Sequence, residues 1–411
     1  MLFPWIGRAA MPSWFYLFLF APALLGSPSP RRDGPTVLPN PARVTFGSEV
    51  VFSATVQSIE PVREAELVLE DSSLRSFVYP AEISVQDGST LAARRDLHAE
   101  PVFPFSSIAY WWEVILNSGD KIVSEKQSLQ YLDDRYSWQV LEKGRATIHW
   151  VEGDNGSAED AADLLLLDLG TISADLETPI PDKTSLYIYP RLADFHSALG
   201  KLAYGWEGAI SDPASGIILI AAAPGAEGRQ ALAALLPHET VHILLGAKWK
   251  SAYASLPLWL VEGTAAGYEV NLHPETDQAL QQAARDGRLI PVATLCRTFP
   301  SDERPALLAY AESKSFVAYL RGIYGLAAVR KAMEDYAAGV DCGQGSVGST
   351  GKNLETLEKS WRTGLTKKQT GMITTWTLVL SASVLLAGVL VAGWILRRRR
   401  KPIPVQKKTS Q

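Results

Sequence analysis

Short runs in which hydrophobic and polar residues alternate occupy the first third of the chain. Glu49–Ser58, Ala65–Glu70 and Ile108–Leu116 are examples, and turn residues such as those at 117–120 separate them. Strands at this spacing, with no amphipathic helix between them, predict a β-sandwich over residues 41–138. No cluster of polar residues in this region indicates chemistry, so we interpret it as a spacer or docking domain.

The pattern changes after Trp138, where strands and helices mix. Ser157, with Asp160 three residues later, predicts the start of the first helix. The predicted strands are Ala146–Trp150, Ser185–Tyr189 and Gly216–Ala222, and the predicted helices are Ala158–Leu169, Leu192–Gly200, 229–245, 257–270, 275–286, 304–322 and 325–338. A small sheet followed by a helical subdomain predicts an α+β domain over residues 139–342, placed after an immunoglobulin- or fibronectin III-like sandwich.

The beginning of the chain has the pattern of a signal peptide. Arg8 precedes an apolar stretch, Trp14 to Leu25, that is too short to span a bilayer. Ala21-Pro22-Ala23 supplies the small residues of a cleavage site. We therefore predict a signal peptide at residues 1–26, with a short uncleaved anchor as the alternative, followed by a Pro- and Gly-rich linker at residues 27–40.

The end of the chain has the pattern of a membrane anchor. Residues 372–396 carry no charge and are long enough to cross a bilayer as one helix. The basic run Arg397–Lys401 follows, and such an excess marks the cytoplasmic side. We predict a single-pass protein of the cell membrane, extracytoplasmic before the helix, with a basic cytoplasmic tail at 397–411. The Gly-, Ser- and Lys-rich residues 343–371 are predicted to be a stalk.

Composition narrows the function classes. The 411 residues carry a formal net charge of −5 although the tail is basic, so the body is acidic and no nucleic-acid partner is expected. The length fits two or three domains. Cys296 and Cys342 are the only cysteines. Outside the cytoplasm they can form a disulfide, and two buried thiols are the alternative.

A metal-binding pattern lies in one of the predicted helices. His238-Glu239-Thr240-Val241-His242 is an HExxH motif, in which the two imidazoles lie one turn apart on one helix face and can reach one ion. Glu239, beside the first ligand, is placed to act on a water molecule. Pro237, directly before the motif, lacks an N–H and is expected to kink a helix interior.

A third ligand is predicted in the next helix. Zinc in a hydrolytic site takes three protein ligands and keeps an open position. Glu262 follows the motif after nineteen intervening residues and is flanked by Leu260, Val261 and Ala265, which predicts burial. A buried carboxylate requires a cation, and a metal ion supplies one.

These motifs carry a resemblance to a known family. The chain resembles the gluzincin zinc metallopeptidases. The residues of its motifs are similar to those of the peptidase MA-like proteins related to aminopeptidase N and thermolysin. That family combines HExxH with a W-L-x-E-G-x-A segment, often followed by a further Glu. Here Trp259-Leu260-Val261-Glu262-Gly263-Thr264-Ala265 and Glu269 match it, with one residue more between the motifs than is usual. The resemblance covers about residues 140–340.

The resemblance also implies an oxyanion-binding tyrosine. The family's helix Y-x-K-G-A-S-V-x-x-x-L corresponds to the segment that begins at Tyr310, with Ser315 and Leu320 in register. A core aromatic is the alternative for Tyr310, and Tyr319 and Tyr324 are the rival hydroxyls. The family's G-x-M-E-N strand, whose Glu binds a substrate ammonium, has no counterpart.

Two further departures concern residues around the motif. Ala266 replaces an Asp that orients an imidazole in thermolysin, so the orienting groups are not identified. The histidines outside the motif lack any motif of their own, and we interpret them as structural or surface residues: His98, His149, His196 and His273.

We therefore interpret the chain as a membrane-anchored zinc metallopeptidase with one Zn²⁺ and a peptide or protein substrate. Glu239 is the predicted general base and Tyr310 the oxyanion donor. A catalytically inactive, peptidase-like surface protein that binds or senses is the rival hypothesis. The strand 216–222 is expected to pair with an extended substrate and carries no acidic residue, which favours an endopeptidase unless Glu207 or Asp212 reaches the site. The sequence makes no prediction of the oligomeric state.

Overall fold

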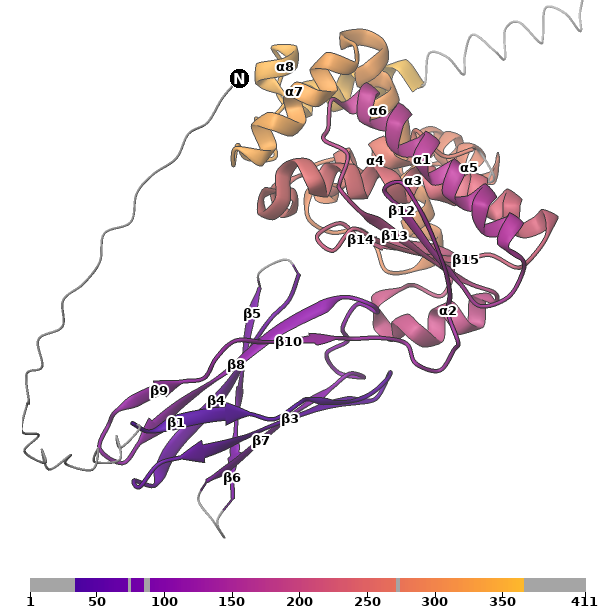
Figure 1. The fold of residues 1–411 in the computed structure, drawn as a ribbon. Helices are drawn as coiled ribbons and strands as arrows, with labels where there is room; N and C mark the ends of the chain where they lie inside the picture. Colours follow the sequence, from indigo (N-terminus) through magenta and orange to yellow (C-terminus); the bar gives the residue numbers. More distant parts are fainter. Residues whose placement is uncertain (1–33, 73–74, 85–88, 271–273, 366–411) are drawn as a thin grey trace, which may run out of the picture.

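The computed structural model describes residues 34–72, 75–84, 89–270 and 274–365 (Figure 1). The predicted signal peptide, transmembrane helix and tail lie outside these ranges, as does His273. None of the helices within these ranges combines the length and the apolar character that crossing a bilayer requires.

Two antiparallel sheets form the N-terminal domain, which confirms a β-rich region there. In β3 and β8 buried residues alternate with partly exposed ones, and the buried side chains, Phe52 and Trp112 among them, share one core. The first sheet contains β1 (Thr36–Pro39), β2 (Arg43–Thr45), β3 (Glu49–Gln57), β6 (Glu82–Ile83) and β7 (Thr90–Asp96), and the second contains β4 (Val62–Glu70), β5 (Ser76–Pro80), β8 (Ser107–Leu116), β9 (Lys121–Val123) and β10 (Gln127–Gln130).

The first strand corrects the predicted linker at 27–40. Thr36–Pro39 pairs with β3, and Val37 is buried in the core of the sandwich. The β-branched residues Thr36 and Val37 favour a strand. Proline at both ends of this short segment had favoured a linker, but proline is compatible with the edge of a sheet, which is where β1 lies.

A second sheet-containing domain follows. Its five strands have the order β11-β12-β13-β15-β14, parallel in the centre and antiparallel at both edges. The strands are β11 (Gln139–Lys143), β12 (Ala146–Trp150), β13 (Thr184–Tyr189), β14 (Ala209–Asp212) and β15 (Ile217–Ala221). Helix α1 (Asn155–Leu176) connects β12 to β13, and α2 (Leu192–Leu199) with the 3-10 turn η1 (Gly200–Leu202) lies between β13 and β14.

The two faces of this sheet bury different partners. Along β15, Ile218 and Ile220 pack against α1 and α3, whereas Ile217 and Leu219 face α2 and the sandwich. Helix α1 begins with Asp154 as its N-cap, whose carboxylate accepts the backbone N–H of Ser157 at 2.9 Å. The predicted cap at Ser157 was therefore three residues late.

The remainder of the domain is helical. It comprises α3 (Ala226–Trp249), η2 (Lys250–Ser255), α4 (Leu258–Ala266), α5 (Pro274–Arg285), η3 (Thr294–Cys296), α6 (Glu303–Tyr324), α7 (Leu326–Ala337), α8 (Val347–Thr350) and a last helix at 354–365. Cys296 and Cys342 form a disulfide with their Cα atoms 6.3 Å apart. This bond ties the η3 segment to the chain after α7.

The last helix corrects the predicted stalk at 343–371. Leu354, Leu357 and Trp361 are buried in the same core as α4 and α6. The indole N–H of Trp361 donates to Ser315 at 3.1 Å, and Arg362 donates to the backbone carbonyl of Ile290 at 2.9 Å. Their spacing of three and four residues puts the apolar side chains on one helix face, so this segment belongs to the domain.

The two domains contact each other through aromatic side chains. Phe105 of the sandwich stacks on Tyr187 of β13 with ring centroids 3.6 Å apart. The hydroxyl of Tyr189 donates to the buried carboxylate of Asp133 at 2.9 Å, and Ser72 donates to Asp212 of β14 at 2.8 Å.

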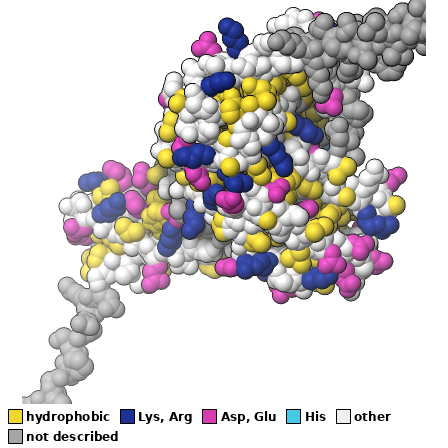
Figure 2. Space-filling model, turned by 90° about the horizontal axis from the view of Figure 1, so that it is seen from above, with side chains coloured by type: hydrophobic (Ala, Val, Ile, Leu, Met, Phe, Trp, Pro, Cys, Tyr) yellow, Lys and Arg dark blue, Asp and Glu magenta, His cyan; other side chains and the backbone are white. Residues whose placement is uncertain are grey.

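On the face seen from above, acidic and basic side chains are interspersed and neither forms a continuous surface (Figure 2).

Candidate metal centre and cleft

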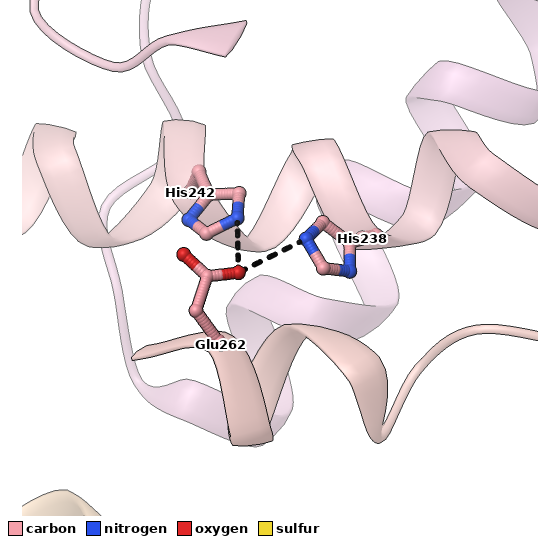
Figure 3. A group of neighbouring side chains, drawn as sticks. All are labelled: His238, His242 and Glu262. Atoms are coloured by element: carbon pink, nitrogen blue, oxygen red, sulfur yellow. Dashed lines mark ion pairs between the residues drawn. The ribbon is translucent and has the colours of Figure 1, made fainter. Parts of the chain in front are cut away.

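Helix α3 carries both histidines of the HExxH motif on one face. The helix continues past Pro237 as a single element, and Pro237 is buried within it. His238 and His242, one turn apart, both point toward Glu262 of α4 (Figure 3). The predicted ligands therefore come together from two helices that contact each other side by side.

The three side chains have the separations that a metal ion requires. The Nε2 atom of His238 lies 3.4 Å from Oε2 of Glu262, and the Nε2 atom of His242 lies 3.6 Å from the same oxygen (Figure 3). Zn–N and Zn–O bonds of about 2.0–2.1 Å in a tetrahedron place neighbouring ligand atoms about 3.4 Å apart. The group fits zinc, and the three ligand atoms lie within 4.8 Å of one another.

The three side chains of this group are coupled through their charges. Burial raises the pKa of Glu262, but the facing imidazoles of His242 and His238 lower it more, so the net pKa lies well below its usual value. An ionised carboxylate and two imidazole nitrogens together form a set of ligands for a divalent cation.

Close helix packing at Gly263 fixes the position of Glu262. A Cβ atom on Gly263 would collide with the backbone carbonyl of Ser313 in α6. Only glycine allows α4 and α6 to approach this closely. Because Tyr310 lies one turn before Ser313, the same contact brings α6 to the metal centre.

Each imidazole has an orienting group on its other nitrogen. The Nδ1 atom of His238 lies 2.5 Å from Oε1 of Glu269, and the Nδ1 atom of His242 lies 3.0 Å from the hydroxyl of Tyr253. Such partners fix the ring orientation and raise the basicity of the ligand nitrogen. They are the orienting groups that the sequence left unidentified.

The sequence carries a signal for only one of these two partners. Glu269 belongs to the family's second motif, although the motif alone does not assign it a role. Tyr253 lies in η2, a connection with no periodic pattern, where one more aromatic residue gives no signal. Burial and the carboxylates of Glu262 and Glu239 raise the pKa of Tyr253 well above its usual value, so it stays a hydroxyl.

The motif's glutamate contacts the edge strand of the sheet. Glu239 is buried, and its Oε2 accepts a hydrogen bond from Ser211 of β14 at 2.6 Å. Strand β15 lies between β13 and β14 in the sheet, so the expectation that 216–222 pairs with an extended substrate is wrong. The strand that is free to pair on its outer side is β14, which the sequence pattern missed because it is short and ends in polar residues.

Tyr310 lies beside the candidate metal centre. Its ring centroid is 6.5 Å from that of His238 and 5.0 Å from that of Phe299. Burial and then the carboxylates of Glu262 and Glu207 raise the pKa of Tyr310 well above its usual value, so its hydroxyl remains a hydrogen-bond donor. The rivals Tyr319 and Tyr324 do not line the cleft.

A cavity of about 450 Å³ joins these groups. Its lining includes His238, Glu239, His242, Glu262 and Tyr310, together with Trp206 and the first three residues of β14, Ala209, Ile210 and Ser211. Glu207 also lines it, whereas the carboxylate of Asp212 is held outside by hydrogen bonds from Ser72 and Ser215. Of the two acidic residues considered for this cleft, Glu207 is the one that reaches it.

The described histidines outside the motif are not part of the centre. His149 stacks on Tyr187 with ring centroids 4.1 Å apart, His196 contacts the backbone carbonyl of Glu207 at 2.8 Å, and His98 is exposed.

The match to one family model agrees with the resemblance in the motifs. Residues 165–367 match the model of the Peptidase MA superfamily. The chain is similar to an aminopeptidase N family protein from Idiomarina loihiensis, with 8% sequence identity, a TM-score of 0.39 and coverage of 74% of this chain and 70% of that chain. It is also similar to a variant of the M1 zinc metallopeptidase from Deinococcus radiodurans, with 13% identity, a TM-score of 0.38 and coverage of 80% and 93%. No curated protein matches it.

Proposed function

We propose that this chain, whose residues 165–367 belong to the Peptidase MA superfamily, is a zinc-dependent peptidase that hydrolyses peptide bonds. The observation that carries the proposal is the convergence of His238, His242 and Glu262, whose ligand atoms lie within 4.8 Å of one another, beside Glu239 and the cavity. The three residues are proposed to hold one zinc ion. When bound, zinc acts as a Lewis acid that polarises a carbonyl and makes water a nucleophile near neutral pH.

Glu239 is proposed to be the general base. It takes a proton from the attacking water and passes it to the leaving amine as the carbon–nitrogen bond breaks. The hydrogen bond from Ser211 to Oε2 fixes this carboxylate, so its other oxygen, Oε1, is available to the water. Ser211 thereby connects the base to the edge strand, along which a peptide substrate is proposed to lie.

Tyr310 is proposed to bind the developing oxyanion. Its hydroxyl is protonated over the working pH range and lines the cavity next to His238. A preorganised donor of this kind contributes about 3 kcal/mol to stabilisation of the transition state.

Hydrolysis of a mixed peptide library by the zinc-loaded chain tests the function. The Glu239→Gln variant keeps the size and the hydrogen-bond acceptor for Ser211 but cannot take a proton, so it is the matched control. Cleavage by the unaltered chain and none by the variant is expected. No cleavage by either, with zinc bound, would contradict the proposal and favour a binding protein.

We also propose an endopeptidase preference. The preference rests on β14, whose outer side can pair with an extended chain that continues in both directions and whose residue nearest the base, Ser211, carries no charge. Glu207, which reaches the cavity from the turn before β14, is a carboxylate that favours a free α-ammonium instead, and acetylation of the substrate decides between the two. A peptide and its N-acetylated form are then expected to be cleaved at similar rates. A large loss on acetylation would indicate an aminopeptidase.

The membrane anchor remains a proposal from the sequence. Residues 372–396 are proposed to span the membrane, with the peptidase domain outside the cytoplasm. A reporter fused after Gln411 should be cytoplasmic, and protease added outside intact cells should digest only the part before residue 372. Digestion of the tail from outside would contradict this orientation.

A further inference from the structure

Helix α6 presents one face to the cavity. Leu307, Tyr310, Ala311 and Lys314 line it, and their spacing of three and four residues puts them on one side of the helix. Lys314 lies one turn after Tyr310, and the proposed mechanism gives it no role. In the family's pattern Y-x-K-G-A this position is an alanine, so the resemblance implies no role for Lys314 either.

Neighbouring helices hold the backbone on both sides of Lys314. Ser313 lies against Gly263 of α4, where an added Cβ atom would be 2.4 Å from the carbonyl oxygen of Ser313. The hydroxyl of Ser315 accepts the indole N–H of Trp361 at 3.1 Å. Because Gly263 directly follows Glu262 in the chain, the side chain of Lys314 begins from a fixed point close to the candidate metal centre.

Lys314 is the only Lys or Arg among the described residues that line the cavity. It is partly buried, and it forms no ion pair within the described part of the chain. Two carboxylates of the cavity already have partners, since Glu262 faces two imidazoles and Glu269 pairs with His238. A cation that has lost part of its hydration without gaining a partner is stabilised by an anion that enters the same cavity.

The spacing of Lys314 from Tyr310 limits where that anion lies on a substrate. Four residues of α-helix advance about 6 Å along the helix axis, and an extended peptide advances about 3.3 Å per residue. A group that Lys314 binds therefore belongs to a residue within about two positions of the carbonyl that Tyr310 binds.

We propose that Lys314 binds a carboxylate of the peptide substrate close to the scissile bond, through a charge-assisted hydrogen bond. The inference rests on the proposed peptidase function and adds a specificity to it. The carboxylate is either the side chain of an Asp or Glu residue or the C-terminal carboxylate of the peptide. The two share their chemistry and differ in where the peptide is cut.

Equilibrium binding separates this subsite from catalysis. The full chain with Glu239→Gln is the parent and is loaded with zinc. It is titrated with a peptide that is fluorescently labelled at its N-terminus and contains one Glu, with the same peptide in which Gln replaces Glu, and with C-terminally amidated forms of both. The carboxylate at the subsite should improve the dissociation constant about 10-fold.

Variants at Lys314 distinguish its charge from its size. Lys314→Met keeps the length of the side chain and removes the ammonium group, so it should abolish most of the preference while zinc content stays the same. Lys314→Arg keeps the charge and should retain the preference. Lys201→Met removes an exposed charge in η1, outside the cavity, and should bind all four peptides as the parent does.

The four peptides identify the source of the carboxylate. If Lys314→Met loses the preference for Glu over Gln, an acidic side chain occupies the subsite. If it loses the preference for the free C-terminus over the amide, the terminal carboxylate does.

Preferences of both kinds that survive in Lys314→Met would overturn the proposal, because zinc or another group then binds the carboxylate. Equal binding of all four peptides by the parent would also overturn it. Failure of the peptidase function is a separate result. In that case the unaltered chain, loaded with zinc, cleaves none of the four peptides, while the dependence of binding on Lys314 persists.

Discussion

The carboxylate of Glu269 lies 2.5 Å from Nδ1 of His238, whose Nε2 faces Glu262 at 3.4 Å. Each of the two nitrogens of this imidazole therefore faces a carboxylate, one from α4 and one from the residues that follow it. Burial raises the pKa of Glu269, but His238 and then Lys314 lower it below its usual value, so it remains an anion that accepts the Nδ1 proton. The predicted consequence is a ring that is already oriented for a metal ion.

Loss of the carboxylate of Glu269 should weaken metal binding. Because an orienting partner raises the basicity of the ligand, Glu269→Gln is expected to reduce zinc affinity about 10- to 100-fold. Competition with a fluorescent zinc chelator measures this. Glu303→Gln, at an exposed position of α6, is the control and should bind zinc as the parent does. Equal affinity in both variants would show that Glu269 has no part in the centre.

Substitutions at two glutamates of the cleft should have different effects on zinc content and on hydrolysis. Glu239→Gln should retain zinc and lose hydrolysis, because an amide cannot accept the proton of water. Glu262→Ala should lose zinc, because two remaining ligands rarely hold a catalytic ion. Zinc content and peptide cleavage are measured on the same preparations. The reverse pairing of phenotypes would mean that base and ligand are exchanged.

Tyr310→Phe should lower the turnover number about 100-fold while zinc content stays the same, since one oxyanion donor is removed. The change deletes a single oxygen and keeps the ring contacts with Phe299 and Trp206. Tyr319→Phe, on the same helix but outside the cavity, is the matched control. A normal rate for the first variant and a low rate for the second would transfer the role to Tyr319.

The sequence was sufficient to bring the three candidate ligands together because the signal for them is local. Spacing of four residues places His238 and His242 on one helix face in any context, and the apolar neighbours of Glu262 indicated its burial. The strand Ala146–Trp150 and the run of helices after it follow from the same periodicity. These features depend on neighbours in the chain, which a sequence displays directly.

The features that the sequence did not predict depend on contacts between segments that are distant along the chain. Strand β14 is four residues long and is stabilised by pairing with β15, so its sequence alone carries little signal. Tyr253 contacts His242 only because η2 folds back over α3. The helix at 354–365 was hidden by the Gly- and Ser-rich residues before it, although the spacing of Leu354, Leu357 and Trp361 could have shown it.

A buried carboxyl outside the cleft makes stability depend on pH. Glu312 is fully buried, and its Oε1 accepts the N–H of Ile290 at 3.0 Å. Burial raises the pKa of Glu312 to about 7, with Arg362 opposing and Glu358 adding to the shift. Its folded-state pKa lies above the unfolded value of about 4.5, so its contribution to stability is present below that value and lost as pH rises through about 7.

Glu312→Gln should remove that dependence and keep the acceptor for Ile290. The fall in unfolding free energy of the parent between pH 5 and pH 8 should exceed that of the variant by up to about 3 kcal/mol. Urea unfolding at both pH values, followed by tryptophan fluorescence, measures the difference. Glu303→Gln should behave as the parent. An identical pH dependence in parent and Glu312→Gln would contradict the raised pKa.

Metal content of the purified protein tests the central claim most directly. The full chain, purified in detergent and dialysed against metal-free buffer, is analysed by inductively coupled plasma mass spectrometry beside His238→Ala, His242→Ala and Glu239→Gln. About one zinc per chain is predicted for the parent and for Glu239→Gln, and almost none for either histidine variant. Stoichiometric zinc in both histidine variants, or none in a parent supplied with zinc, would contradict a metal centre formed by His238, His242 and Glu262.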